Sequence, residues 1–424
     1  MQQYREDPLV EKILSDLHKA IKRHPEICEF EIIPSTEAQK NKSPVIYIES
    51  HLGLESWCVK HIFTYIHNTI ISLRKSKSKI HDTHRLERLL LGGVILNPDI
   101  NTFWNIRREL VLENNIDIKN ELHISQIVLS HKPKSNETFI YREWILQRMI
   151  KMQVIQVDEQ LHNLIQQELS IASKAIDKCS NNYHATNYKL YIMRNLAPLI
   201  PLYFEIILQN ELNRSEINMS TAVSDSSIFY YRQQIINILK DVPIQLDEKY
   251  LNKLQILLKQ NVSCKDIDRA SSNDMIITLL GKPPSTKLNT FRITCLSNFL
   301  KVLTSELVFI SELNRMFPCH ESIWYHRRFV LWELMLILYN FYDKNMISKK
   351  FMFHEEQRIS NTSMNITQQS LTHFEQCDTF LDCIVLYKMI VNNEKNELEC
   401  CDYEQNKFVD RHRKWLILNF NLVV

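Results

Sequence analysis

The chain has 424 residues, of which 45% are hydrophobic, so it can bury a substantial core. It contains only four glycines and carries a formal net charge of +2. Glycine is scarce, and neither Gly-x-Gly-x-x-Gly nor Gly-x-x-x-x-Gly-Lys occurs. A glycine-rich nucleotide-binding loop is therefore excluded. The balanced charge argues against nucleic acid as a partner, because nucleic-acid-binding domains carry a strong basic patch.

The ten cysteines are scattered without a Cys-x-x-Cys pair, and residues 1–7 are mostly polar. We therefore expect reduced thiols and a cytoplasmic protein. No run approaches the roughly 20 apolar residues of a membrane-spanning helix, so no transmembrane segment is expected. His81, His84 and Glu87 have ligand-like spacing, but no further ligand follows them, and we predict no metal site in this chain.

The first expected elements precede any repeat. A helix is predicted over residues 8–23, because apolar residues recur there at helical spacing: Val10, Ile13, Leu14, Leu17 and Ile21. Two short β-rich runs, residues 30–33 and 45–48, are expected to pair as a small hairpin. A second helix is expected over residues 54–73. Residues 1–84 are thus predicted to form an N-terminal helical region with a short hairpin.

From about residue 84 the chain repeats a short motif, an aromatic residue followed three positions later by arginine. The pairs are Trp104 and Arg107, Phe139 and Arg142, Phe229 and Arg232, Trp324 and Arg327, and Phe408 and Arg411. A further copy has Thr186 and Lys189 in these places. The first three intervals, of 35, 47 and 43 residues, suit one helical hairpin per repeat. We therefore predict an all-α fold over residues 85–424, an α-solenoid crescent of antiparallel helical hairpins.

Two insertions are expected in this solenoid, because the later motif intervals lengthen to 95 and 84 residues. The segments near 262–290 and 343–372 look like inserted loops, the second rich in Asn, Ser, Thr and Gln.

The motif residues are interpreted as structural. An aromatic residue and an arginine three positions apart lie on adjacent turns of one helix face. The aromatic ring can fill the space between hairpins, and the planar guanidinium can bond carbonyls or carboxylates of the neighbouring repeat. One such pair would carry no signal, but five pairs are fairly specific.

This pattern resembles the repeat of protein prenyltransferase α subunits, in which Pro and Asn lead into a Trp-x-x-Arg helix. The closest copies are residues 133–146 and 182–189, and the resemblance covers roughly residues 85–420. It implies an α subunit that wraps a catalytic β subunit and is active only with it. The β subunit is expected to hold a zinc ion that activates the acceptor cysteine, so no cofactor is expected in this chain.

The resemblance also implies candidate catalytic residues. Lys134 stands where the family has a lysine that helps to bind the isoprenoid diphosphate, whose developing charge needs a cation. Asn136 replaces the family's tyrosine, while Tyr183 and His184 match a polar cluster near the same pocket. Taken without the resemblance, Lys134 is an exposed lysine at the start of a helix. Tyr183 and His184 are then equally compatible with packing.

Further likeness at residues 54–60, 96–99 and 223–225 narrows the resemblance to a geranylgeranyltransferase of type III. It implies a β subunit of the Rab geranylgeranyltransferase type, geranylgeranyl diphosphate as co-substrate and a protein cysteine as acceptor. The alternative is a non-catalytic helical-repeat scaffold that binds protein partners. Lys134 with residues 182–184 favours the enzyme, because a scaffold has no need of a cation and a polar cluster at one pocket.

Overall fold

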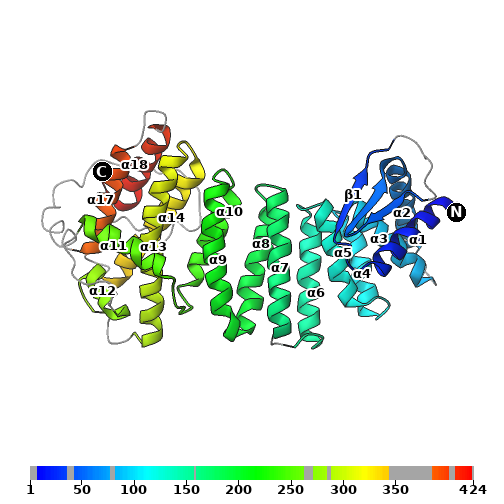
Figure 1. Cartoon of the computed structure of the whole chain (residues 1–424), viewed down its shortest axis with the longest axis horizontal. Coiled ribbons are helices and arrows are strands. Elements are labelled where there is room, and N and C mark those ends of the chain that lie inside the picture. Colours follow the sequence, from blue (N-terminus) through cyan, green and yellow to red (C-terminus); the bar gives the residue numbers. More distant parts are fainter. Residues whose placement is uncertain are drawn as a thin grey trace. The chain divides into compact units, whose positions relative to one another are not determined.

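The computed structural model describes residues 7–35, 43–76, 82–156, 159–261, 271–283, 288–342, 384–400 and 406–422. The chain divides into two compact units, Met1–Tyr203 and Phe204–Val424. The first unit contains a small sheet and the helices up to α8, and the second contains the helices from α9 onward (Figure 1). The boundary expected after residue 84 lies inside the first unit.

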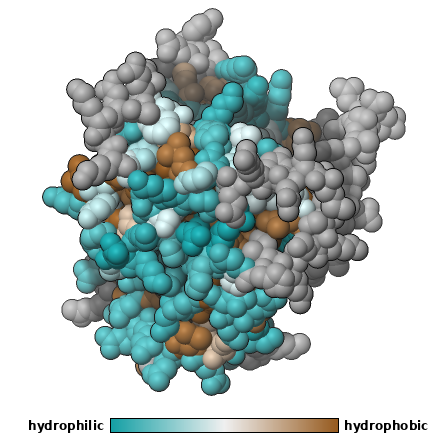
Figure 2. Space-filling model, turned by 90° about the vertical axis from the view of Figure 1, so that its right-hand side faces the viewer, coloured by the Kyte–Doolittle hydropathy of each residue, from teal (hydrophilic) through white to brown (hydrophobic). Residues whose placement is uncertain are grey.

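Helix α1 (Pro8–Arg23) begins at Asp7, whose carboxylate accepts hydrogen bonds from the backbone N–H groups of Leu9 and Val10. Its predicted apolar face is buried. Helices α2 (Ser56–Ser76) and α3 (Thr83–Leu96) pack on it. A Cβ at Gly92 of α3 would lie 2.5 Å from Leu14, so glycine permits this close crossing. Seen from this end, the coloured surface is mostly hydrophilic, with hydrophobic residues in separate patches (Figure 2).

A three-stranded sheet follows α1 in the chain and precedes α2. Its strands are β1 (Glu29–Ile33), β2 (Val45–Ile48) and β3 (His51–Glu55). The expected pairing of residues 30–33 with 45–48 is wrong, because β3 lies between those strands. Strand β3 runs parallel to β1 and antiparallel to β2. Strand β3 was not predicted, because its last two residues fall within the helix expected over residues 54–73. Gly53 gives β3 room, since a Cβ there would lie 2.3 Å from Ile33.

The rest of the first unit consists of helical hairpins, each a first helix followed by a motif helix. These hairpins are α3 with α4 (Asn101–Leu112), α5 (Ile118–His131) with α6 (Asn136–Lys151), and α7 (Glu159–Lys178) with α8 (Tyr183–Tyr191). A π-helical turn η1 (Ile192–Leu196) and a 3-10 turn η2 (Ala197–Leu199) follow α8. The predicted all-α repeat fold with a small N-terminal extension is confirmed.

The second unit repeats this arrangement with extra helices. Its motif hairpins are α9 (Pro201–Thr221) with α10 (Ser226–Ile238), α13 (Thr290–Met316) with α14 (Glu321–Phe341), and α17 (Val385–Glu399) with α18 (Asn406–Phe420). Helices α11 (Glu248–Asn261) and α12 (Ser272–Leu280) come between α10 and α13 in the chain and pack on α13 and α17.

The segment expected to be a loop near 262–290 is therefore partly helical. Ser271 and Asp274 form a reciprocal capping box that starts α12, and Gly281 ends the helix with a φ of 71°. Met275 and Leu279 anchor the helix in the core. The second expected insertion, residues 343–372, lies outside the described residues.

Helix α13 is the central helix of the second unit. By length and composition it could cross a membrane, although the sequence analysis expected no such helix. However, 72% of its most apolar window is buried inside the protein. A core helix meets the same criterion, and α13 packs against α10, α11, α12 and α14.

Candidate functional site

The motif aromatics lie buried where successive motif helices meet. Each ring contacts the tyrosine or histidine that precedes the arginine position, or Lys189 in its place, in the next copy. The centroid distances are 4.5 Å for Trp104 and Tyr141, 5.2 Å for Phe139 and Tyr188, 5.8 Å for Phe229 and His326, and 5.1 Å for Trp324 and His412. These rings therefore join one repeat to the next, and none of the four is exposed to solvent.

Four motif arginines are buried, and each forms a two-point ion pair with a glutamate of the next motif hairpin. The N–O distances are 2.7 and 2.6 Å for Arg107–Glu121, 2.9 and 2.5 Å for Arg142–Glu168, 3.3 and 2.5 Å for Arg232–Glu306, and 3.1 and 2.7 Å for Arg327–Glu394. The planar guanidinium matches a carboxylate in this geometry.

The same glutamates also bind the motif helix of their own hairpin. Glu121 accepts from the Tyr141 hydroxyl at 2.7 Å, and Glu306 lies 2.8 Å from Nε2 of His326. Glu211 accepts a corresponding bond from Tyr231 at 2.6 Å. Each Glu121-type carboxylate thus connects two motif helices to the first helix between them.

These glutamates were not predicted from the sequence, although the sequence carries a signal for them. A Glu-Leu pair occurs 20 residues before the Tyr or His that precedes each motif Arg or Lys in four copies. The glutamate and its partner are Glu121 and Tyr141, Glu168 and Tyr188, Glu211 and Tyr231, and Glu306 and His326. If every repeat contains the same buried ion pair, an acidic residue should recur at a constant distance before each arginine position.

Burial and neighbouring charges shift the pKa values of two groups in this network, Glu394 and Tyr188. Burial alone would raise the pKa of Glu394, but the charge of Arg327 and hydrogen bonds from His412 and Arg327 lower it to about 2. Burial, and then the adjacent Glu168 carboxylate, raise the pKa of the Tyr188 hydroxyl well above its usual range. At Glu394 the network thus favours the charged carboxylate, and at Tyr188 it favours the neutral hydroxyl.

The structure corrects the sixth motif copy. Phe408 is half-buried and Arg411 is exposed, where it pairs with the equally exposed Glu321 at 2.8 Å. His412 instead takes the buried position, 2.8 Å from Glu394. The arginine position of the sixth copy is therefore Arg413, two residues after the predicted Arg411. The sequence prediction was misled because Phe408 and Arg411 reproduce the three-residue spacing by themselves.

The three candidate catalytic residues lie at the N-terminal ends of motif helices α6 and α8. Lys134 is exposed in the turn before α6. Asn182 is buried and donates from Nδ2 to the carbonyl of Pro133 at 2.7 Å, which holds this turn against the start of α8. Tyr183 and His184, the first two residues of α8, are both exposed. One buried amide therefore brings Lys134 and the pair at 183–184 to the same edge of the first unit.

The helix ends at this edge differ in how they are capped. Asn182 caps α8 by accepting from the N–H of Ala185 at 3.1 Å. Ser135, at the start of α6, makes no such side-chain bond within the described residues. The first N–H groups of α6 thus receive no cap from Ser135, and the exposed Lys134 lies in the turn just before them. Together these groups can stabilise negative charge on a phosphate.

The described part of the chain offers no metal-ligand set. There, no three His, Cys, Asp or Glu side chains are grouped as metal ligands would be. His84 is exposed and lies 3.9 Å from Glu87, while His81 falls outside the described residues.

Comparison with known proteins identifies the repeat. Residues 303–334 match the family model of the protein prenyltransferase alpha subunit repeat, a segment that contains the Glu306–His326 pair and Arg327. The chain is similar to "Protein prenyltransferase alpha subunit repeat-containing protein 1" of Homo sapiens, with 28% identity over 96% of both chains. The protein of the same name from Danio rerio is 29% identical over 77% of this chain and 73% of its own length.

A second kind of relative is matched over part of the chain only. "Geranylgeranyl transferase type-2 subunit alpha" of Saccharomyces cerevisiae is 24% identical over 42% of this chain and 52% of its own length. The matched repeat, the recurring Arg–Glu–Tyr/His network and the similarity over nearly the whole chain agree with one another. Residues 303–334 thus match a protein prenyltransferase alpha subunit repeat, and over nearly its whole length the chain is similar to a protein named for that repeat.

Proposed function

We propose that this chain is the α subunit of a heterodimeric protein prenyltransferase, which transfers a geranylgeranyl group to a protein cysteine. The observation that carries the proposal is the edge formed by Lys134, the uncapped start of α6, and exposed Tyr183 and His184. The partial similarity to a geranylgeranyl transferase type-2 α subunit supports the same reaction class. The proposed partner is a β subunit of the Rab geranylgeranyltransferase type, and the proposed compartment is the cytoplasm.

The role of this chain in the reaction would be electrostatic. As the bond from the isoprenoid carbon to the diphosphate oxygen breaks, negative charge grows on the leaving group. A lysine ammonium and the free N–H groups of a helix start stabilise such charge without moving. The hydroxyl of Tyr183 and the imidazole of His184 can donate hydrogen bonds to the remaining oxygens. The β subunit is expected to supply the zinc and the acceptor thiolate.

The motif helices also offer a surface for the β subunit. An aromatic side chain stands two positions after the arginine position in several copies and is only half-buried: Trp144, Tyr191, Phe329 and Trp415. In the second unit, Tyr230 and Tyr325 are exposed beside a cavity of about 570 Å³ at the starts of α10 and α14. Aromatic residues are enriched in protein interfaces, which supports docking of a partner on the motif helices.

The test is co-expression of the full chain with each candidate β subunit, followed by single-turnover transfer from geranylgeranyl or farnesyl diphosphate. Lys134→Ala in the assembled heterodimer is expected to slow transfer by about 100-fold, the usual loss for one charge-stabilising contact. Lys151→Ala is the matched control, because Lys151 is exposed at the opposite end of α6. Gel filtration checks that both variants still assemble.

Three outcomes would count against the proposal or part of it. A rate for Lys134→Ala within about threefold of wild type would remove Lys134 from the leaving-group site, since that change is below about 1 kcal/mol. Assembly with only the β subunit shared by CaaX-type enzymes would refute the proposed partner. Stable binding of a β subunit without transfer of either isoprenoid would favour the alternative of a helical-repeat scaffold.

A further inference from the structure

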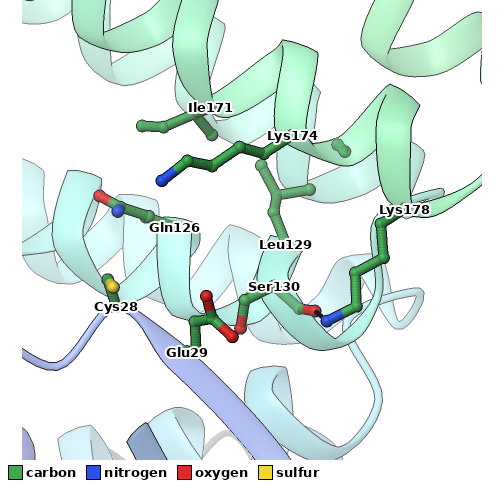
Figure 3. A pocket seen from close by; sticks show the side chains of 9 residues that line it. Cys28, Glu29, Gln126, Leu129, Ser130, Ile171, Lys174 and Lys178 are labelled. Carbon is green, nitrogen blue, oxygen red and sulfur yellow. Dashed lines mark hydrogen bonds between the residues drawn. The ribbon is translucent and has the colours of Figure 1, made fainter. Parts of the chain in front are cut away.

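Two neighbouring cavities in the first unit form one groove between α5 and α7, the first helices of successive hairpins. Their volumes are about 680 Å³ and 80 Å³, and Gln126, Ile171 and Lys174 line both. The smaller cavity reaches Glu29, the first residue of β1, and Cys28 just before it (Figure 3). Lys134, Tyr183 and His184 line neither cavity, so the α5–α7 groove is made of other residues than the proposed diphosphate site.

Internal bonds hold the walls of the groove in place. Lys178 of α7 donates from Nζ to the carbonyl oxygen of Ser130 in α5 at 2.6 Å, which ties the C-terminal ends of the two helices together (Figure 3). Arg142 of α6 bonds to both helices as well. It donates to the carbonyl of Leu122 in α5 at 2.6 Å and to the carboxylate of Glu168 in α7 at 2.5 Å. A groove whose width is fixed in advance loses less entropy when it binds a ligand.

The groove carries positive charge that no described residue neutralises through an ion pair. Lys119 and Lys174 are exposed on its two walls, and neither forms an ion pair with any residue that the structure describes. In Figure 3 the ammonium of Lys174 extends toward Gln126. Of the two lining carboxylates, Glu168 is saturated by its buried partners, and Glu29 lies at the β1 end, 3.4 Å from Nε2 of His51. The stretch between Lys119 and Lys174 therefore favours an anion.

The neutral side chains of the groove favour a peptide over a free phosphate. Gln126, Gln166 and Gln167 carry amides that can both donate and accept, as a peptide backbone requires. Leu164 and Ile171 add an apolar floor for aliphatic side chains. Arg142, the guanidinium that lines this groove, is already engaged by Glu168 and so is not available for a two-point contact with a phosphate.

We propose that the α5–α7 groove binds an extended acidic segment of a partner protein. Lys119 and Lys174 pair with carboxylates of the segment, the glutamines bond its backbone, and Leu164 and Ile171 contact its aliphatic side chains. Charge complementarity of this kind mainly raises the association rate and selects among partners. The proposal does not depend on transferase activity, because the groove lies outside the diphosphate site.

The test measures binding of fluorescein-labelled peptides to the full chain by anisotropy. The first probe alternates Glu with Leu, and two control probes carry Gln or Lys in place of Glu. We expect the Glu probe to bind at least about tenfold more tightly than the Gln probe, a difference of roughly 1.4 kcal/mol. Added salt should weaken the Glu probe most, because screening acts on exposed charges.

A double charge reversal, Lys119→Glu with Lys174→Glu, should weaken the Glu probe by at least about tenfold. Lys151→Glu is the matched control, since it reverses an exposed lysine outside the groove and should leave binding unchanged. Both lysines of the double variant are exposed, so folding should survive, and a thermal melt checks this. Phosphatidylserine vesicles and inorganic phosphate are tested as competing ligands.

Either of two results would overturn the proposal. In the first, the double reversal changes affinity for the Glu probe by less than about twofold, or the Gln probe binds equally well. In the second, the variant loses binding to phosphatidylserine vesicles while no peptide binds the wild-type chain, which would assign the groove to a lipid surface. Loss of peptide binding in the double variant alone, with Lys151→Glu unaffected, would establish it.

Discussion

Arg142 tests the idea that buried ion pairs join the repeats. The guanidinium is 1% exposed and makes four contacts, two with Glu168 and one each with the carbonyl of Leu122 and the hydroxyl of Ser125. Arg142→Ala would leave Glu168 buried and charged, with the Tyr188 hydroxyl as its remaining partner at 2.5 Å. Breaking a buried pair in this way costs about 3–5 kcal/mol.

An exposed pair in the same unit provides the matched control. Arg74 and Glu109 approach to 2.9 Å, but their side chains are 45% and 55% exposed. Such a pair contributes about 0–1 kcal/mol, because water and salt screen it. Arg74→Ala should therefore leave the free energy of unfolding nearly unchanged, although the distance between the charged groups resembles that of the buried pair.

The measurement is urea unfolding followed by tryptophan fluorescence, because two of the six tryptophans, Trp104 and Trp144, lie beside this network. Adding Glu168→Gln to Arg142→Ala should restore part of the loss, because the double variant no longer buries an unpaired carboxylate. The two changes should then be clearly non-additive. A loss below about 1 kcal/mol for Arg142→Ala, or strict additivity in the double variant, would refute the claim that this pair joins the hairpins.

Three further changes have defined outcomes. In the folded protein the pKa of Glu394 is about 2, against an ordinary value of 4.5. The charged carboxylate therefore stabilises the fold fully above pH 4.5, and this stabilisation is lost as the pH falls toward 2. Acid unfolding of Glu394→Gln should lack the loss of stability in this pH range. Gly281→Ala should cost about 1 kcal/mol in a thermal melt, because its φ is 71°. Tyr231→Phe should cost about 1–3 kcal/mol in urea, because buried Glu211 loses a hydrogen bond.

The repeat could be predicted from the sequence because its constraints are local. An aromatic residue and an arginine three positions apart must share a helix face, so the spacing alone assigns Trp104 with Arg107 and Trp324 with Arg327 to motif helices. The sixth copy was misplaced because spacing alone does not show which of two adjacent registers is buried. Only the contact between His412 and Glu394 distinguishes them.

The N-terminal sheet and helix α12 could not be predicted, because they depend on long-range contacts. Strand β3 pairs with β1, which lies about 20 residues earlier in the chain, and no periodic pattern in the sequence predicts this pairing. The contact of Gly53 with Ile33 forms only when the two strands are paired. Helix α12 is short and lies in a segment whose Gly281 and following prolines resemble a loop. Its capping box, Ser271 with Asp274, was present in the sequence but went unrecognised.

The candidate site depended on the family resemblance, and the packing explains why. Lys134 has no feature of its own that distinguishes it from other exposed lysines. What distinguishes it is the turn that carries it, which Asn182 holds against the start of α8 through the carbonyl of Pro133. A contact between residues 49 positions apart leaves no trace in local spacing, so the sequence could identify the residues but not bring them together.

The polar residues of the repeat fall into two groups, and this division limits where chemistry can occur. The arginines, glutamates and tyrosines of the network are buried and already paired, so recruiting any of them for catalysis would expose an unpaired charge or hydroxyl at a cost of several kcal/mol. Side chains at the helix starts, such as Lys134 and His184, are exposed. They can change without loss of packing. Any activity of this chain must therefore arise from the helix ends and from surface grooves, and the buried network keeps those surfaces in position.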